Sequence, residues 1–188
     1  MIVEHVILDR DGVLGVEAPG GWVLRVEDWR WQDGALEALA MLSRGRTLSV
    51  ATNQSCIGRG LVDAAGVEAV HASMIAGAAD VGATVAGVYC CPHAPREGCS
   101  CRKPEPGLLH QAIADAGTSP DRSVFVGDSA KDLEAARRAG VTPILVRTGK
   151  GRVTESGSAA AGVAVFDDLL SFAHFLSRGG TLTPLGTP

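Results

Sequence analysis

The residues best suited to chemistry follow the first apolar run of this sequence. Asp9 and Asp11 come directly after Ile7 and Leu8, and Gly12 follows them. An apolar run that stops at acid and glycine is typical of a buried strand ending in a tight loop. Two carboxylates one residue apart can bind a cation or act covalently, although a single acidic residue is enough to form a turn. A role as turn formers alone therefore remains the alternative interpretation of this pair.

Polar residues elsewhere in the chain extend the pattern. Thr52 and Asn53 follow a strand predicted over 47–51, and Asp128 follows a later one. Parallel strands joined by right-handed crossovers place such loops along one edge of the sheet. Carboxylates suit Mg²⁺, while a hydroxyl, an amide and the ammonium of Lys103 suit the binding of a phosphoryl group. This set of side chains indicates phosphoryl transfer, and a carboxylate can serve as its nucleophile through an aspartyl phosphate.

A second cluster of potential ligands lies in one short segment that holds four of the five cysteines. Cys91, His93, Cys99 and Cys101 offer three thiolates and one imidazole, a complete tetrahedral set for structural Zn²⁺. Cys90 is an alternative to Cys91 in this set. Because no coordination position stays open, we expect the zinc to stabilise an irregular loop and to take no part in the reaction.

The composition limits the class of protein. The 188 residues are 46% hydrophobic and 20% charged, which fits a globular chain and argues against disorder. The net charge of −4 argues against a general nucleic-acid binder. Since the sequence contains neither a signal peptide nor an apolar run of the roughly 18 residues that a membrane span needs, we expect a cytoplasmic location. We also expect a monomer that acts on a small phosphorylated metabolite, with no nucleic-acid or membrane partner.

Strand and helix patterns alternate along the chain, which predicts an α/β fold with a parallel, Rossmann-like sheet between two layers of helices. Asp33 is the expected N-cap of the first helix. We expect a single domain over 1–177 and a loose C-terminal tail over 178–188. The predicted strands are 2–8, 47–51, 85–89, 123–126, 143–146 and 163–165, and the predicted helices are 34–43, 61–81 (or a helix pair), 108–116, 132–139 and 167–176.

The polar residues match a known family in order and spacing. The run Asp9-Arg10-Asp11-Gly12-Val13-Leu14 resembles the first motif of the haloacid dehalogenase-like phosphatases. Their second, third and fourth motifs are similar to Thr52, Lys103 and Gly127-Asp128-(x3)-Asp132. The resemblance extends from Ile2 to about Lys150.

This resemblance implies a role for each matched residue. Asp9 is expected to be the nucleophile, and Asp11 the general acid that later becomes the general base. Thr52 and Lys103 are expected to hold the phosphoryl oxygens.

The resemblance also implies a magnesium site. Its expected ligands are Asp9, the main-chain carbonyl of Asp11, and Asp128. Asp132 either supports this site or is simply a polar residue that opens a helix.

Within the superfamily, three segments look like the heptose-1,7-bisphosphate 7-phosphatase branch, namely 52–60, 101–107 and 146–151. That branch has a zinc-bound loop and no large cap domain, and histidinol-phosphate phosphatases share much of its pattern. The expected activity is Mg²⁺-dependent removal of the 7-phosphate of a heptose 1,7-bisphosphate, with Arg102 on the distal phosphate or a sugar hydroxyl. The alternatives are a histidinol-phosphate phosphatase, another small sugar-phosphate phosphatase, and a non-catalytic, zinc-stapled binding module.

Two features depart from the branch pattern. Val13 and Gly15 stand where the branch often has Thr and Asn, so the sugar contacts near the first loop are expected to differ. The zinc loop is also short, with only 94–98 between its two halves. The natural substrate or its anomer is therefore the least constrained part of the prediction.

Overall fold

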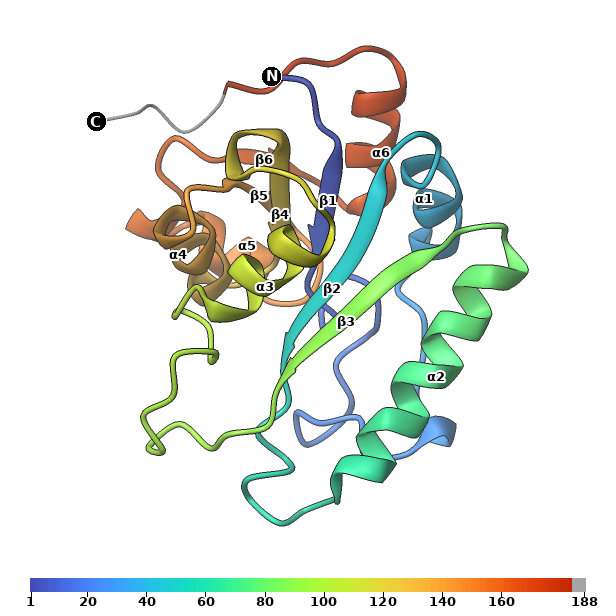
Figure 1. The fold of residues 1–188 in the computed structure, drawn as a ribbon, viewed down its shortest axis with the longest axis vertical. Helices are drawn as coiled ribbons and strands as arrows, with labels where there is room; N and C mark the ends of the chain where they lie inside the picture. The colour runs from blue at the N-terminus through green and yellow to red at the C-terminus, as the bar shows by residue number, and fades with distance from the viewer. Residues whose placement is uncertain (184–188) are drawn as a thin grey trace.

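A single parallel sheet is the centre of the structure, a computed structural model that describes residues 1–183 (Figure 1). The strand order is β3-β2-β1-β4-β5-β6, and every neighbouring pair is parallel. From β1 the chain winds to one side and later returns to build the other, so the topology switches beside β1. The strands are β1 (His5–Leu8), β2 (Thr47–Asn53), β3 (Val85–Cys91), β4 (Ser123–Gly127), β5 (Thr142–Val146) and β6 (Ala164–Phe166).

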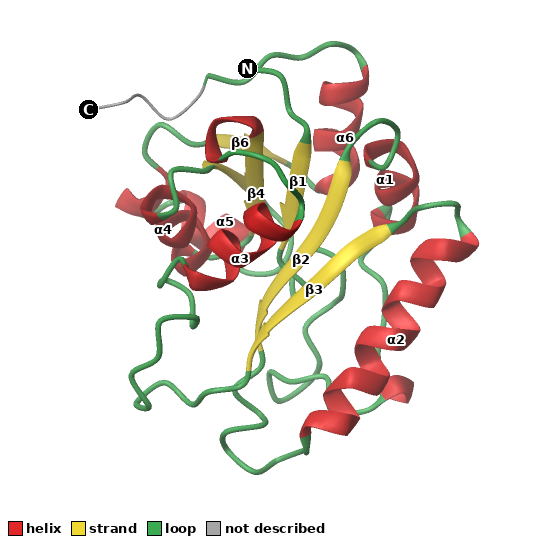
Figure 2. Cartoon of the chain, viewed as in Figure 1, coloured by secondary structure: helices red, strands yellow, loops and turns green. Residues whose placement is uncertain are grey.

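Helices cover both faces of the sheet (Figure 2). Side chains of α1, α2 and α6 share one buried cluster with the sheet, and those of α3 and α4 share the other. The predicted α/β architecture is therefore confirmed. The α-helices are α1 (Ala35–Leu42), α2 (Ala64–Asp80), α3 (Gly107–Asp115), α4 (Ala130–Arg138), α5 (Gly151–Glu155) and α6 (Leu169–Ser177), and the 3₁₀ segments are η1 (Val26–Asp28), η2 (Pro120–Arg122) and η3 (Ser158–Ala160).

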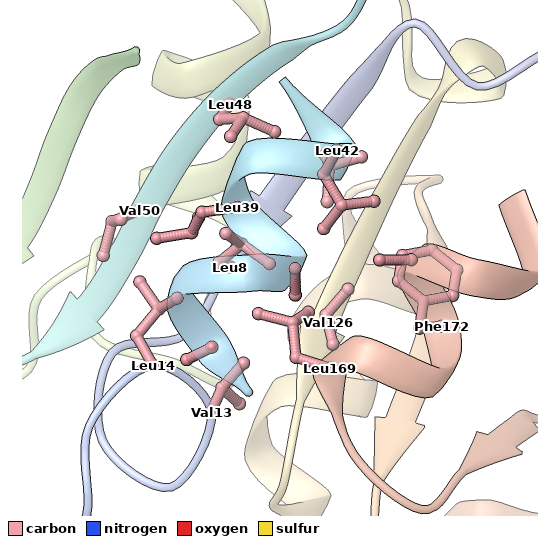
Figure 3. Close-up of a cluster of buried hydrophobic side chains, with 14 of the residues drawn as sticks. Leu8, Val13, Leu14, Leu39, Leu42, Leu48, Val50, Val126, Leu169 and Phe172 are labelled. Carbon is pink, nitrogen blue, oxygen red and sulfur yellow. The ribbon is translucent and has the colours of Figure 1, made fainter. Parts of the chain in front are cut away.

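The central strand β1 is buried on both faces. Because successive side chains of a strand point to opposite faces, Leu8 packs with the α1 side and Ile7 with the α3 and α4 side. Figure 3 shows Leu39 and Leu42 of α1 packed on the sheet beside Leu8. This two-sided core fixes the end of β1 and, with it, the loop that carries Asp9 and Asp11.

Several element boundaries differ from the prediction. Gly34, with φ of 73°, is the N-cap of α1, so the expected cap at Asp33 is wrong. The left-handed backbone at this position favours glycine over aspartate. The segment predicted over 61–81 contains a single helix, α2, which begins only at Ala64 because Asp63 is its N-cap and accepts a hydrogen bond from the Gly66 amide at 2.8 Å. The short helix α5 was not predicted, because five residues give too little periodicity to detect.

Part of the predicted loose tail over 178–188 is packed in the structure. Leu182 is buried, and its carbonyl accepts a hydrogen bond from the Met1 ammonium group at 2.8 Å. The ordered chain thus reaches beyond the predicted boundary at 177. Residues 184–188, which complete the predicted tail, lie outside the described residues.

Across residues 1–183, no helix combines the length and the apolar character that crossing a bilayer requires.

Candidate active site

A cavity of about 330 Å³ opens at the carboxyl ends of the central strands. Loops after β1, β2 and β4 contribute to its lining, as expected at a topological switch point. All six residues predicted to be catalytic or to bind the substrate reach this cavity: Asp9, Asp11, Thr52, Asn53, Arg102 and Lys103. Asp128 and Asp132 line it as well.

Three carboxylates and one ammonium group form the floor of the cavity. Lys103 Nζ lies 2.8 Å from Asp9 Oδ1 and 2.7 Å from Asp132 Oδ1. It also donates to the Ala51 carbonyl at 2.9 Å, so two carboxylates and one carbonyl surround the buried ammonium group. Lys103 is only 2% exposed, so it is not a solvated surface lysine. Asp9, Asp128 and Asp132 each offer an oxygen within 4.8 Å of the others.

The charges in this cluster do not balance. Burial raises the pKa of Asp9 well above its usual range, although Lys103 opposes the effect. Burial, reinforced by the Asp132 carboxylate, raises the pKa of Asp128 to about 7. Burial acts in the same direction on Asp132, but Lys103 outweighs it and the pKa of Asp132 is lowered. One ammonium group thus faces three carboxylates, and the excess of negative charge suits a divalent cation.

The backbone around Asp128 is shaped to bring other groups close to its carboxylate. A Cβ atom on Gly12 or on Gly149 would lie 2.1 Å from Asp128 Oδ2, so both positions exclude a side chain. The Lys150 amide donates to this oxygen at 2.8 Å. Hard carboxylate oxygens held this close at the end of a sheet are a donor set that fits Mg²⁺.

Asp132 has a second task in the local structure. Its Oδ2 accepts hydrogen bonds from the amide and the hydroxyl of Ser129, which form a capping box at the start of α4. Its Oδ1 faces Lys103. Both oxygens are therefore engaged by protein groups, so Asp132 holds Lys103 and the helix start together.

Asp11 points away from the three-carboxylate cluster. Its Oδ1 accepts from Arg10 Nε at 3.1 Å and from Arg10 Nη2 at 3.0 Å. Its Oδ2 accepts from Arg10 Nη2 at 3.0 Å and from Gln54 Nε2 at 2.8 Å. The two aspartates of the first loop thus have different surroundings, although only one residue separates them in the sequence.

Thr52 and Asn53 lie within the end of β2, two residues further than the predicted strand end. Thr52 Oγ1 accepts a hydrogen bond from Gln54 Nε2 at 2.7 Å, so its own hydroxyl hydrogen is free to donate. The Asn53 amide donates to the Lys103 carbonyl at 3.1 Å and accepts from the Lys103 amide at 3.0 Å. Asn53 therefore fixes the backbone of Lys103, although it also lines the cavity.

The predicted zinc ligands converge beside the cavity. The donor atoms of Cys91, His93, Cys99 and Cys101 all lie within 4.8 Å of one another. Cys91 Sγ is 3.7 Å from Cys99 Sγ and 3.6 Å from His93 Nδ1, and Cys101 Sγ is 3.3 Å from His93 Nδ1. Tetrahedral ligands of zinc lie about 3.6–3.8 Å apart, given its bond lengths to sulfur and nitrogen. The donor set therefore fits Zn²⁺ in kind and in spacing.

Within the described residues, Cys91 and not Cys90 belongs to this cluster. The two residues are neighbours on β3, where successive side chains point to opposite faces. The loop that carries the cluster also positions Arg102, whose Nη1 donates to the His93 carbonyl at 3.1 Å. The thiol–imidazole cluster thus supports one wall of the cavity.

The residues missed by the sequence analysis include two buried ones that contact the predicted site residues. Arg10 is fully buried, and Gln54 is 1% exposed. Both donate to Asp11, and Gln54 also donates to Thr52. The sequence did contain a signal for Arg10, which lies between Asp9 and Asp11 at the end of a buried strand. An arginine in that position needs an acidic partner, so its involvement in the site could have been predicted. Nothing in the local pattern distinguished Gln54.

Fold and site together define a class. The sheet is parallel and Rossmann-like, and its site combines an aspartate pair after β1, polar residues at the end of β2, a buried lysine and two aspartates after β4. This is the arrangement of a haloacid dehalogenase-like phosphatase. The family model described as HAD-hydrolase-like matches residues 100–172.

Curated relatives narrow this class. A D-glycero-β-D-manno-heptose-1,7-bisphosphate 7-phosphatase of Pseudomonas putida is 42% identical over 93% of this chain and 99% of its own length. The enzyme of the same name from Bordetella bronchiseptica is 39% identical over 93% of this chain and 98% of its own length. The chain therefore belongs to the family of the heptose-1,7-bisphosphate 7-phosphatases.

Solved structures agree with this assignment. The D,D-heptose 1,7-bisphosphate phosphatase of B. bronchiseptica, complexed with magnesium and phosphate, matches with a TM-score of 0.89 and 38% identity over 95% of this chain and all of that one. The phosphatase of Burkholderia thailandensis matches with a TM-score of 0.71 and 37% identity over 93% of this chain and 99% of that one. The resemblance to this branch is thus confirmed over nearly the whole chain.

Proposed function

We infer that this phosphatase removes the 7-phosphate of D-glycero-D-manno-heptose 1,7-bisphosphate through an aspartyl phosphate on Asp9. The observation that carries the proposal is the position of Asp9 at the floor of a cavity with Lys103 and Asp128 beside it. The names of the relatives supply the substrate, and their β-anomer is the first one to test.

Asp9 is oriented as a nucleophile by two donors on one oxygen. Asp9 Oδ1 accepts from the Arg10 amide at 2.7 Å and lies 2.8 Å from Lys103 Nζ. Both of these contacts, made within residues 1–183, fall on Oδ1, and we assign the attack on phosphorus to Oδ2. The positive charge of Lys103 stabilises the negative charge that spreads over the phosphoryl oxygens as the bond to Oδ2 forms.

Proton transfer in both steps is assigned to Asp11. In the first step, Asp9 bonds to phosphorus, the bond to the sugar oxygen breaks, and Asp11 donates a proton to that oxygen. In the second step, Asp11 takes a proton from water as the water oxygen bonds to phosphorus. The Asp9–phosphorus bond then breaks, and inorganic phosphate and the free carboxylate are released.

A magnesium ion would be held by Asp9 and Asp128, with the main-chain carbonyl of Asp11 as the third protein ligand. When bound, it neutralises charge on the phosphoryl oxygens and on the carboxylate cluster. Thr52 donates its free hydroxyl hydrogen to a phosphoryl oxygen. Lys103 acts through its charge and through its hold on Asp9 and Asp132.

The rim of the cavity suits a second anionic group on the substrate. Four basic side chains line it together with the carboxylates: Arg59, Arg102, Lys131 and Lys150. Arg102 is fixed by the zinc loop, and the Arg59 guanidinium lies over the Trp22 ring at 5.5 Å. A bisphosphate matches this positive rim better than histidinol phosphate, which carries an amine at its far end.

A zinc ion on Cys91, His93, Cys99 and Cys101 would be structural, because four protein ligands leave no open position. Its place in the proposal is to hold the loop that carries Arg102 and Lys103. The chain is further proposed to act as a cytoplasmic monomer with a single domain, whose packing reaches at least Leu182.

The test is phosphate release by metal-loaded protein from four compounds: the α- and β-anomers of heptose 1,7-bisphosphate, histidinol phosphate and 4-nitrophenyl phosphate. We expect release to require Mg²⁺ and kcat/KM to be highest for one heptose bisphosphate anomer. Equal, slow rates on the bisphosphate and on histidinol phosphate would refute the substrate. No release from any of the four would favour the non-catalytic binding module.

A further inference from the structure

Arg10 carries a fully buried guanidinium that the proposed reaction does not use. Arg10 is 0% exposed, yet it stands in the first loop between the two aspartates. Burying a guanidinium is costly unless every side of it is matched by a partner. The partners of Arg10 therefore show what the residue is for.

Three side chains surround this guanidinium, and we call the two that lie outside the first loop, His71 and Trp29, its seat. Asp11 takes its Nε and Nη2 hydrogens. His71 of α2 lies with Nε2 3.2 Å from Arg10 Nη1. The Trp29 ring covers the group from a centroid distance of 5.9 Å. Arg10 is thus held by Asp11 of its own loop, by His71 of α2 and by Trp29.

The histidine in this seat is suited to accept from Arg10. Burial, with a further contribution from the Arg10 charge, lowers the pKa of His71 to about 4. A neutral imidazole has one nitrogen that accepts a hydrogen bond, and Nε2 is the nitrogen facing Arg10. The His71 ring therefore matches the guanidinium without adding a second positive charge.

Gly15, one of the departures from the branch pattern, belongs to the same seat. A Cβ atom at Gly15 would lie 2.4–2.5 Å from atoms of the Trp29 ring. Trp29 is 7% exposed and stacks edge-on with Trp31 at a centroid distance of 5.3 Å. The absence of a side chain at position 15 is what lets Trp29 reach over Arg10.

On these contacts we propose that Arg10 is a positioning residue for Asp11, with His71 and Trp29 as its seat. Arg10 contacts both oxygens of the Asp11 carboxylate, and Gln54 fixes one of them from the other side. The carboxylate that transfers the protons is thereby held in one rotamer at the cavity wall. This inference rests on the proposed function, because it assumes that Asp11 transfers the protons.

The test uses leaving groups that differ in their need for a proton. The alkoxide leaving from the 7-position of a heptose bisphosphate must be protonated, whereas 4-nitrophenolate leaves without help. Misplacing Asp11 should therefore slow formation of the phosphoenzyme from the sugar ester more than from the aryl ester. The constant kcat/KM measures this difference, because it includes only the steps up to departure of the leaving group, whereas kcat also contains the hydrolysis step that both substrates share. A defect in folding, or in the position of Asp9, should slow both substrates by the same factor.

We expect Arg10→Met to lower kcat/KM for the heptose bisphosphate by about 100-fold and kcat/KM for 4-nitrophenyl phosphate by less than about tenfold. Because Arg10→Met removes a buried charge that holds Asp11 and His71, this variant can fail to fold. Two milder variants of His71 therefore provide a second test. His71→Leu removes the acceptor on Arg10 and should shift the ratio of the two kcat/KM values in the same direction. His71→Gln keeps an acceptor and should retain the wild-type ratio.

Asp11→Asn separates this inference from the proposed function. If the wild type releases no phosphate from either substrate, the proposed function fails. If Asp11→Asn lowers kcat/KM by the same factor for both substrates, the role of Asp11 as proton donor to the leaving group fails. A third outcome is that Asp11→Asn lowers kcat/KM more for the sugar ester than for the aryl ester, while His71→Leu and any folded Arg10 variant lower it equally for both. In that case only the positioning role of Arg10 is overturned.

Discussion

The carboxylate cluster and the thiol–imidazole cluster lie side by side at one end of the sheet but are built in opposite ways. Asp9 follows β1, Asp128 follows β4 and Asp132 lies in the first turn of α4, so the three meet only because β1 and β4 are neighbours. The four zinc-type ligands lie within a single short stretch that follows β3. The first cluster depends on the topology of the sheet, whereas the second needs only local chain geometry.

The electrostatics of the two clusters differ as well. The carboxylates are buried around one lysine and carry an excess of negative charge. The thiols and the imidazole form a closed four-donor set at the distances that a tetrahedral zinc requires. We conclude that the first cluster is built for a cation that meets a substrate and the second for a metal that holds a loop.

Removing the nucleophile should give the largest effect. Asp9→Asn keeps the volume of the side chain and loses its charge, so we expect kcat to fall on the order of 10⁴-fold or more while the fold persists. Phosphate release and the melting temperature, measured on the same preparation, check both parts. Appreciable turnover by this variant would rule out the covalent route.

Breaking the buried ion pair should cost mostly stability. Asp132→Asn leaves Lys103 with Asp9 as its single carboxylate partner, and we expect a loss of about 3–5 kcal/mol in the free energy of unfolding. Denaturant titration measures the change. As a matched control, Glu134→Gln removes an exposed acid of the same helix and should change stability by less than about 0.5 kcal/mol. Equal effects of the two variants would show that Asp132 is no more than a polar residue at a helix start.

Disrupting the second cluster should have an indirect and smaller effect on catalysis. Cys99→Ser should lose bound zinc, loosen the loop that carries Arg102, and lower kcat/KM by about tenfold. Metal analysis and steady-state kinetics test the two effects together. Cys56→Ser is the matched control, because Cys56 lies outside the cluster and should not change the zinc content. Wild-type protein without zinc would refute the assignment.

The smallest effect concerns His71, behind the carboxylate site. Its pKa is lowered by burial from 6.5 to about 4, so the folded protein binds its proton less readily than the unfolded chain does. The stability that the neutral ring provides is present above pH 6.5 and is lost as the pH falls toward 4, by up to about 1.4 kcal/mol per pH unit. The wild type should therefore lose stability relative to His71→Gln over this range. A constant difference between the two proteins would contradict the prediction.

The two clusters also show what a sequence can predict. The zinc-type ligands were predicted from their close spacing, with Cys90 left as an alternative to Cys91, because their geometry is local. Asp9, Asp128 and Lys103 were brought together by combining strand order with a family resemblance, and the structure places them in one cavity. The strand–helix alternation likewise predicted the architecture, because burial imposes a periodicity that survives in the sequence.

What could not be predicted depends on three-dimensional partners. The pairing of Asp11 with Arg10 and Gln54 arises where the ends of β1 and β2 meet, and nothing in either segment encodes it alone. The cap at Gly34 depends on a left-handed backbone that spacing does not reveal. Packing of Leu182 against the first residue was hidden by a Gly-, Thr- and Pro-rich composition that resembles a loose tail.

The central claim, that Asp9 forms a phosphoenzyme, is tested most directly in the Asp11→Asn variant. Without Asp11, an aryl phosphate should still phosphorylate the enzyme, because 4-nitrophenolate leaves unprotonated, while hydrolysis of the intermediate slows. Acid-quenched protein, digested and analysed by mass spectrometry, should then carry a phosphoryl group on the peptide containing Asp9. A stoichiometric release of 4-nitrophenolate with no phosphoryl group on that peptide, or with one elsewhere, would contradict the account.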